Sequence, residues 1–176
     1  MEQFDIAICG YGPVGSTFAG LMGKLGHKVL VIEKNIGPSP TARAINTDGE
    51  QLRTFDRLGI AEKVVENSHE VHCVHFGDAN LNPIQTIEVP VGVSAMGWPN
   101  QVLFYQPELE GFIRASVEAE NNIVIKEGTE LLSFDDTPEG VTLNCKNSDG
   151  DLSFISKYLV GCDGASSFVR RELDVD

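Results

Sequence analysis

A glycine-rich turn near the start of the chain has the residue spacing of a phosphate-binding loop. The turn is Gly10-Tyr11-Gly12-Pro13-Val14-Gly15, and it directly follows an apolar run, Phe4–Cys9. The first glycine allows a tight turn, the second lets a pyrophosphate approach the backbone, and the third lets a helix pack closely on the sheet. The proline lies near the first helical turn, where its missing N–H costs nothing. The helix N-terminus would then face the phosphates.

An acidic residue follows where such a loop needs one. A second apolar run, Val29–Ile32, ends in Glu33, roughly 20 residues beyond the turn, and Lys34 comes next. A carboxylate there can accept a hydrogen bond from a ribose 2′-OH, and it repels a 2′-phosphate. The order strand, turn, helix, strand, acid predicts a site for the ADP half of a dinucleotide. A plain βαβ unit is the alternative.

The composition limits the fold class, the partners and the location that can be expected of the protein. The 176 residues include 41% hydrophobic residues and 18 glycines, which favours one α/β domain with many turns. The net charge of −13 argues against a nucleic acid or an anionic membrane as partner. The N-terminus lacks a basic region and no apolar run is long enough to span a membrane, so a cytoplasmic protein is expected. Of the four cysteines, Cys9 and Cys162 are expected to be buried and reduced.

The elements around the turn follow from periodicity. A helix is expected up to Leu25, with Gly26 ending it, and its apolar residues Val14, Phe18, Leu21, Met22 and Leu25 have helical spacing. Small residues at positions 15, 19 and 23 suit close packing on a sheet. A loop over residues 35–46 carries Arg43. A second helix starts at the N-cap Asp48 and closes at Gly59.

The rest of the chain alternates short strands with one more helix. Residues 71–93 read as strands and turns, which predicts a small antiparallel lobe. Pro107 opens a helix. An apolar strand at 123–125 and three antiparallel strands at 129–135, 141–146 and 152–156 follow, and an apolar run at 158–160 leads into Gly161–Arg171. Ser166-Ser167 are expected to cap a final helix, 168–173.

Taken together, these motifs make the chain resemble the FAD-binding part of the single-component aromatic hydroxylases, the family typified by para-hydroxybenzoate hydroxylase. The phenol and 3-(3-hydroxyphenyl)propionate hydroxylase branch is the most similar. Four segments carry the resemblance: Gly10–Glu33, Thr41–Ala44 with the helix that follows it, Gln106–Glu110, and Gly161–Arg170, which is similar to the family motif GADGxxSxVR.

The resemblance implies a fold and a set of ligand-binding residues. The fold is a Rossmann-like FAD-binding domain of glutathione-reductase type, with a parallel central sheet, an antiparallel three-stranded crossover sheet and the insertion 71–93. Residues 1–176 would form one incomplete FAD-binding domain. The residues implied to bind the cofactor are Gly10, Gly12, Pro13, Val14, Gly15, Glu33, Lys34, Arg43, Gln106, Asp163 and Gly164.

For three of these residues an ordinary structural role is also open. Arg43 would neutralise phosphate charge along FAD, or it is a solvated arginine. Gln106 would bind FAD near its ribityl chain, or it is a helix cap. Asp163 would bind ribityl or pyrophosphate groups through water and backbone, in a motif that also serves NAD(P)H, or Asp163-Gly164 is only a tight turn.

The implied reaction is hydroxylation of an aromatic, phenolic substrate. NAD(P)H would reduce FAD, and a flavin C4a-hydroperoxide formed with O₂ would transfer one oxygen atom. The cofactor supplies this chemistry, so no catalytic acid or base is predicted in the chain. The alternatives are a halogenase, an epoxidase or a saturating reductase with the same motifs, or a catalytically silent nucleotide-binding module.

The chain departs from the family pattern at its end. In the family a later strand ends in a Gly-Asp motif that meets the flavin, and the substrate-binding sheet is built largely by later residues. Asp176 precedes both. A fragment, or a shortened relative that is inactive alone, is therefore expected. A parallel sheet lacking one strand leaves an open edge and predicts self-association.

One histidine-rich segment suggests a metal site, but the sequence favours none. In His69-Glu70-Val71-His72-Cys73-Val74-His75 the first two histidines have the wrong separation for HExxH. On a single strand, His69, Cys73 and His75 would share a face and His72 would point away. Surface histidines on a strand are the preferred interpretation.

Overall fold

The computed structural model describes residues 2–175 and divides the chain into two compact units. One unit comprises the chain up to Pro40 together with the chain from Ile113 onward, and the other is Thr41–Phe112. Each unit has its own sheets and is described by itself.

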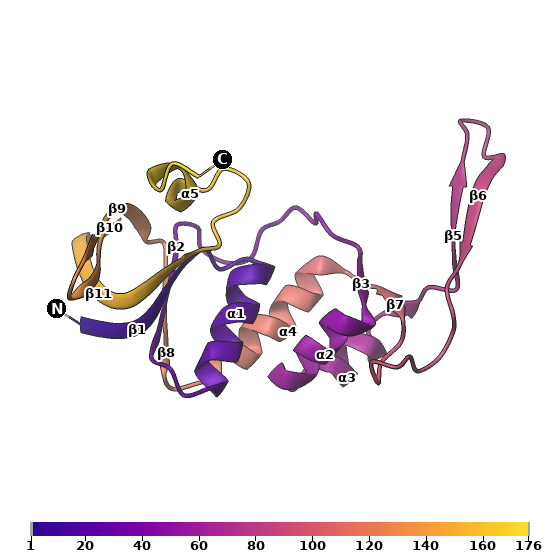
Figure 1. The fold of residues 1–176 in the computed structure, drawn as a ribbon, viewed down its shortest axis with the longest axis horizontal. Coiled ribbons are helices and arrows are strands. Elements are labelled where there is room, and N and C mark those ends of the chain that lie inside the picture. The colour runs from indigo at the N-terminus through magenta and orange to yellow at the C-terminus, as the bar shows by residue number, and fades with distance from the viewer. Residues whose placement is uncertain (1, 176) are drawn as a thin grey trace. The chain divides into compact units, whose positions relative to one another are not determined.

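The first unit contains a six-stranded mixed sheet in the order β8-β2-β1-β11-β10-β9 (Figure 1). The strands are β1 (Glu2–Cys9), β2 (Val29–Glu33), β8 (Ile123–Glu127), β9 (Glu130–Thr137), β10 (Gly140–Asn147) and β11 (Gly150–Gly161). The neighbours β8, β2, β1 and β11 run parallel, whereas β11, β10 and β9 are antiparallel. This arrangement confirms the predicted α/β class, with its parallel central strands and three antiparallel strands.

Strand β11 joins two segments that the sequence suggested were separate. The runs 152–156 and 158–160 form one continuous strand, because β1 pairs with it along its length, from Glu2 opposite Phe154 to Cys9 opposite Gly161. The exposed Lys157 between the runs is accommodated by an ion pair to Asp5, with 2.7 Å between Nζ and Oδ1. Polar residues facing solvent therefore do not interrupt the strand.

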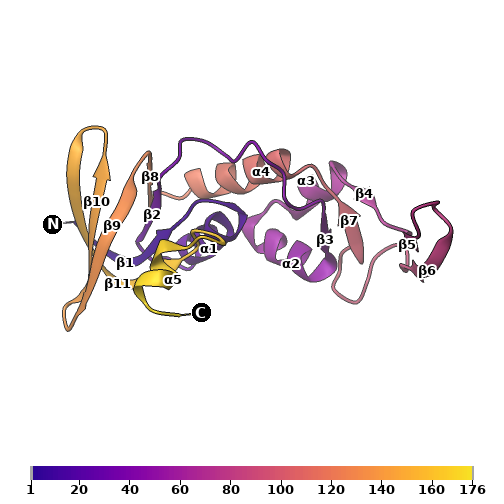
Figure 2. The same ribbon diagram turned by 90° about the horizontal axis from the view of Figure 1, so that it is seen from above.

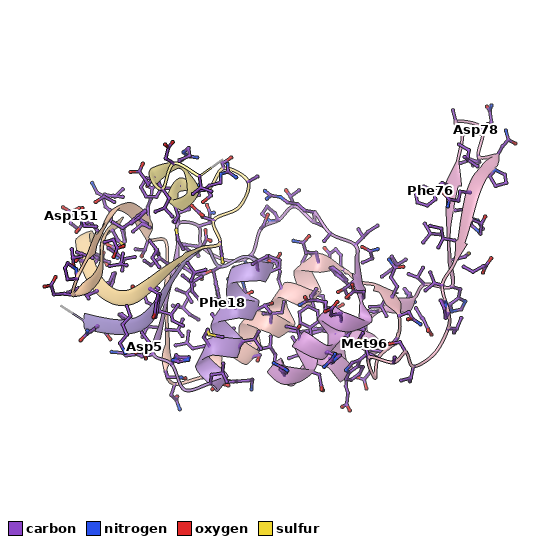
Figure 3. All side chains as sticks on the ribbon, viewed as in Figure 1. Asp5, Phe18, Phe76, Asp78, Met96 and Asp151 are labelled. Atoms are coloured by element: carbon purple, nitrogen blue, oxygen red, sulfur yellow. The ribbon has the colours of Figure 1, made fainter. Side chains whose placement is uncertain are left out.

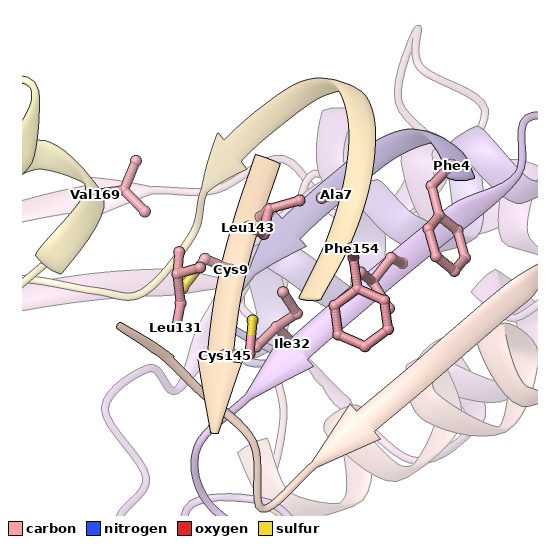
Figure 4. Packing of buried hydrophobic residues seen from close by; sticks show 10 residues of the cluster. Phe4, Ala7, Cys9, Ile32, Leu131, Leu143, Cys145, Phe154 and Val169 are labelled. Atoms are coloured by element: carbon pink, nitrogen blue, oxygen red, sulfur yellow. The ribbon is translucent and has the colours of Figure 1, made fainter. Parts of the chain in front are cut away.

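A hydrophobic core lies between the parallel strands and the antiparallel strands (Figure 4). Its buried members come from five strands and the last helix: Phe4, Ala7, Cys9, Leu30, Ile32, Leu131, Leu143, Cys145, Phe154 and Val169. The rings of Phe4 and Phe154 meet edge to face, with centroids 6.2 Å apart. This packing fixes the antiparallel strands against the parallel strands that carry the glycine turn.

Helix α1 (Pro13–Lys24) packs on β1, β2 and β8 through small residues. Its buried residues are Gly15, Ser16, Ala19, Gly20 and Gly23, whereas Val14 and Leu25 are 71% and 69% exposed. The small residues bring the helix backbone close to the sheet, as their spacing predicted. The large apolar residues Val14 and Leu25 therefore do not mark the buried face of this helix.

The second unit combines two helices with two small antiparallel sheets. The helices are α2 (Gly49–Leu58) and α3 (Ala61–Glu66); one sheet has the order β3-β7-β4, with β3 (Asn46–Asp48), β7 (Gln101–Leu103) and β4 (His69–Glu70). Helix α2 has the predicted ends. The Gln51 N–H donates to Asp48 Oδ1 over 2.8 Å, and Gly59 closes the helix in the left-handed conformation.

The other sheet of this unit is a two-stranded hairpin of β5 (Cys73–Gly77) and β6 (Pro83–Glu88). Figure 3 shows Phe76 on this hairpin and Asp78 at its turn. The Asp78 carboxylate accepts hydrogen bonds from the backbone N–H groups of Asn80 and Asn82, which shapes the turn. Every residue of β6 is exposed.

Two further helices complete the chain. Helix α4 (Gln106–Glu118) buries Leu109, Ile113 and Val117. Helix α5 (Phe168–Glu172) begins at the N-cap Ser167, as predicted, and lies beside the end of β11 in both views (Figures 1 and 2). Among the residues the structure describes, no helix is long and apolar enough to cross a membrane.

The close packing of α1 on the sheet predicts opposite effects on stability when each of two helical glycines is replaced by alanine. A Cβ at Gly23 would lie 2.5 Å from Ile123 Cδ1, whereas a Cβ at Gly111 in α4 would meet nothing within 4 Å. Gly111→Ala should raise the free energy of unfolding by about 1 kcal/mol through helix propensity. Gly23→Ala should lower it, because Ile123 must move. Urea unfolding of the two variants measures both effects, and an equal gain in both would contradict the packing described.

Candidate functional site

The glycine turn lies where β1 and β11 end side by side. The Cys162 N–H donates to Cys9 O over 2.7 Å, and the Gly10 N–H donates to Ile32 O over 2.8 Å. Gly10 has φ +106°, and a Cβ there would lie 2.3 Å from Cys162 O. A Cβ at Gly15 would lie 2.0 Å from Gly10 O. No other residue type fits either position without moving the backbone.

The second glycine of the turn faces open space. A Cβ at Gly12 would meet no atom within 4 Å, although its neighbours are tightly packed. Gly12 is the N-cap of α1, Pro13 starts the helix, no side chain caps it, and its first turn has no acidic residue. The first N–H groups of a helix have no partner within the helix. This helix end therefore offers backbone donors and a positive dipole end to an anion, and it fits a pyrophosphate.

Glu33 is the last residue of β2, and its side chain contacts the backbone of the glycine turn. Its Oε2 accepts a hydrogen bond from the Tyr11 N–H at 2.9 Å, and its Oε1 accepts from the N–H and the Nδ2 of Asn35, both at 2.9 Å. Each carboxylate oxygen has two acceptor sites, so capacity for a ribose hydroxyl remains. The sequence predicted Glu33 only as a cofactor ligand and did not indicate its hydrogen bonds with Tyr11 and Asn35. The next residue, Lys34, is exposed.

Asp163 lies next to the glycine turn and shapes the start of α5. Its Oδ2 accepts hydrogen bonds from the N–H groups of Phe168 at 2.6 Å and Val169 at 3.2 Å, and the Ser167 hydroxyl donates to its Oδ1. Burial by itself raises the pKa of Asp163, but the hydrogen bonds from Ser167 and the backbone outweigh it and hold the pKa below its ordinary value of 3.8. Gly164 follows with φ +84° and is exposed.

In the second unit, Gln106 is a buried anchor for the segment that carries Arg43. Its Oε1 accepts hydrogen bonds from the N–H groups of Arg43 at 2.5 Å and Ala44 at 2.8 Å. Its Nε2 donates to Glu110 Oε1 at 2.7 Å. One N–H of the carboxamide is not used by these contacts. Arg43 itself is exposed, so Gln106 fixes its backbone and leaves its side chain in solvent.

Glu110 was missed by sequence reasoning, although it lies one helical turn after Gln106. It is only 2% exposed, and its Oε2 has no hydrogen-bond partner among the described residues. Its acceptor role fixes the orientation of the Gln106 amide, because the NH₂ group must face the carboxylate. The i, i+4 spacing of Gln106 and Glu110 was the sequence feature that could have indicated this pair.

The residues that the sequence predicted to bind a cofactor therefore lie in two groups. Within the first unit the glycine turn, Glu33 and Asp163 lie at neighbouring strand ends. Within the second unit Arg43 and Gln106 are joined by a hydrogen bond.

The histidine-rich segment does not form one strand face. His69 lies in β4, whereas Cys73 and His75 lie in β5 of a different sheet. His75 Nε2 is 3.2 Å from Cys73 Sγ, and its Nδ1 is 2.8 Å from Thr86 Oγ1. Among the described residues, no group of three or more histidine, cysteine, aspartate or glutamate side chains could hold a metal ion.

The cysteines near the turn are free thiols with little tendency to ionise. Cys9 is buried, and burial is the main cause that raises its thiol pKa to about 12. Cys162 is half-buried rather than buried, and burial again raises its pKa. Neither environment activates a thiolate nucleophile.

The contacts of Asp163 predict a pH-dependent contribution to stability. Its pKa is lower in the folded protein, so the contribution is present above the unfolded pKa and is lost as the pH falls through the folded one. Asp163→Ala should lower the free energy of unfolding by about 1 kcal/mol at neutral pH. The difference from wild type should shrink in acid. Urea unfolding at about pH 7 and about pH 3 tests this, with the exposed Asp151 (Figure 3) as the control position; a pH-independent difference would contradict it.

Comparison with known sequences gives a consistent set of relatives. The family model described as FAD binding domain matches residues 3–176. A 3-(3-hydroxy-phenyl)propionate/3-hydroxycinnamic acid hydroxylase of Escherichia coli is 33% identical over 175 residues, which cover 99% of this chain and 31% of the relative. The protein of the same name from Mycolicibacterium smegmatis is 29% identical over 97% of this chain and 30% of its own length. The chain thus spans under a third of these relatives.

Solved structures agree with the sequence relatives. The p-nitrophenol 4-monooxygenase of Pseudomonas putida superposes with a TM-score of 0.90 at 25% identity, covering 98% of this chain and 44% of that one. A ternary complex of aklavinone-11 hydroxylase with FAD and aklavinone has a TM-score of 0.83 at 26% identity, covering 99% of this chain and 35% of that one. With the glycine turn and Glu33 in place, these matches show that the chain belongs to the FAD binding domain family, in the form found in aromatic hydroxylase-type flavoprotein monooxygenases.

Proposed function

We propose that this chain binds FAD and forms the FAD-binding part of a monooxygenase that hydroxylates an aromatic, phenolic substrate using NAD(P)H and O₂. The relatives named as hydroxylases support the reaction class, and the complex with FAD and aklavinone supports a cofactor and an aromatic substrate bound together. Because the chain spans under a third of those hydroxylases, we propose that it is inactive alone and acts within a longer protein.

The observation that carries FAD binding is the open N-terminus of α1. Gly12 faces free space, no side chain caps the helix, and its first turn has no acidic residue. In the proposed complex the FAD pyrophosphate lies against Gly10, Gly12, Pro13, Val14 and Gly15. Donors fixed in the backbone bind a phosphate without the entropy cost of ordering side chains.

The adenosine half of FAD is assigned to the carboxyl end of β2. Glu33 would accept a hydrogen bond from a ribose hydroxyl with the acceptor capacity that Tyr11 and Asn35 leave. Lys34, exposed beside it, would face the same end of the cofactor. The carboxylate disfavours a 2′-phosphate, which fits FAD because FAD has none.

The other proposed contacts lie in the two remaining motifs. In the first unit, Asp163 and Gly164 would bind FAD through backbone and water, because the Asp163 carboxylate already accepts three protein hydrogen bonds. In the second unit, Arg43 would offer its exposed guanidinium to phosphate, and Gln106 would donate its remaining N–H. Residues 71–93 would be an insertion lobe of one FAD-binding domain.

When bound, FAD supplies the redox and oxygen-activating chemistry of the reaction. The proposed work of this chain is to bind and orient the cofactor. No described side chain is assigned a proton-transfer step.

Titration with FAD tests the proposal directly. The chain should bind FAD with a change in the visible flavin spectrum, and a chain that produces no change would overturn FAD binding. Glu33→Gln should weaken binding about tenfold, since it keeps the shape and loses the charge. Glu33→Arg should abolish binding, because it also breaks the contact with Tyr11. Glu139→Arg, in the exposed turn between β9 and β10, is a charge-matched control expected to bind normally.

We further propose that the isolated chain self-associates through β11. Its ladder with β10 ends at Ser156, and no other described strand pairs with residues 157–161 on that side. Tyr158 in this stretch is 67% exposed. Light scattering should give a mass above the 19.1 kDa of one chain, and Tyr158→Lys should lower it, because a charge on an open edge disfavours pairing. A monodisperse wild-type monomer would contradict this proposal.

A further inference from the structure

The side chain of Arg114, on helix α4, contacts the glycine turn. The Arg114 side chain is 12% exposed. Its Nη1 lies 2.6 Å from Glu127 Oε1, and its Nη2 donates to Tyr11 O over 3.1 Å. The guanidinium carbon lies 4.2 Å from the centroid of the Tyr11 ring. One side chain therefore makes an ion pair, a backbone hydrogen bond and a cation–π contact, the last two with the same residue.

Tyr11 is the residue between the first two glycines of the turn, and side chains hold both of its backbone polar groups. Its N–H donates to Glu33, and its C=O accepts from Arg114. The ring is 1% exposed, and its hydroxyl has no hydrogen-bond partner among the described residues. The ring is thus held by packing and by the guanidinium above it, and not by its hydroxyl group.

Glu127 extends the same network to the chain after β2. It ends β8, and its Oε1 also accepts a hydrogen bond from the Gly37 N–H over 3.0 Å. The Arg114–Glu127 pair therefore links the ends of β8 and β2 with the turn after β1. These are three neighbouring parallel strands, and a nucleotide is expected at their carboxyl ends.

From this network we propose that Arg114 is a positioning residue for FAD, which holds Tyr11 so that Gly12 and the N-terminus of α1 stay in the conformation that binds pyrophosphate. The inference rests on the proposed function. Two features make arginine the suitable residue: its planar fork reaches Glu127 and Tyr11 O at once, and its flat face covers the ring. A lysine ammonium is a compact point charge and cannot reproduce this geometry.

A partly buried ion pair that only supports packing would have a different effect. Such a pair changes stability and leaves the affinity of the folded protein for FAD unchanged. A positioning residue changes affinity even where the variant is fully folded. It also changes affinity for ADP in the same proportion, because ADP is the part of FAD that contacts the turn.

The experiment compares Arg114→Lys and Arg114→Met with wild type in the full chain. Affinity for FAD is measured by titration, and affinity for ADP by competition, at a temperature where circular dichroism shows every variant folded. Hydrogen exchange of residues 10–16 in the FAD-free protein reports on the turn directly. Lys24→Met is the matched control, because it breaks an ion pair of α1, with 3.2 Å between Lys24 Nζ and Glu120 Oε1, away from the turn.

Arg114→Met should weaken binding of FAD and of ADP about tenfold or more and speed exchange in residues 10–16. Arg114→Lys should recover only part of the affinity. Lys24→Met should bind FAD as wild type does. Wild-type affinity in folded Arg114→Met would overturn the inference and leave the proposed function intact. Failure of the wild-type chain to bind FAD would overturn the proposed function. In that case unchanged exchange in Arg114→Met would overturn the turn-holding role as well, and faster exchange would support it.

Discussion

The structure of the first unit depends on one close backbone contact. Where β1 and β11 end, Gly10 lies against Cys162 and Gly15 lies against Gly10, at distances that leave no room for a Cβ. This contact sets where the chain turns out of the sheet and therefore where α1 begins. The small buried residues of α1 continue the same close approach along the sheet, up to Gly23 against Ile123. A bulky residue at any of these positions would lift the helix end from the place where a phosphate could meet it.

Local charge compensation explains how a chain with net charge −13 can offer a site to an anion. Three carboxylates lie near the turn, and each has its own donors. Glu33 accepts from Tyr11 and Asn35, and Glu127 is paired with Arg114. Asp163 accepts from Ser167 and from the N–H groups that follow it. The first turn of α1 carries no acid at all. The helix N-terminus therefore presents its positive end to a phosphate, and the ion pair with Arg114 offsets the charge of Glu127.

The features that the sequence could predict are those that depend on local spacing. The glycine positions, the caps at Asp48 and Ser167 and the end of α2 at Gly59 each follow from residues a few positions apart. The roles of Tyr11 and Arg114 could not be predicted this way, because their contact joins residues far apart in the chain. The spacing also could not show that Val14 and Leu25 are exposed. Helical spacing shows which residues share a face but not which face meets a sheet through small residues.

Gln106 shows how a buried hydrogen-bond network can fix a loop segment. An amide has a donor end and an acceptor end, and the Nε2 of Gln106 donates to Glu110 Oε1. The carbonyl then faces Arg43 and Ala44, and both of their N–H groups donate to it. The Gln106 side chain thereby fixes the loop segment at Arg43 and Ala44, and Glu110 fixes the orientation of Gln106. The sequence offers Gln106 as either a cap or a cofactor ligand. The geometry adds a role as the anchor that sets the backbone from which the Arg43 side chain extends.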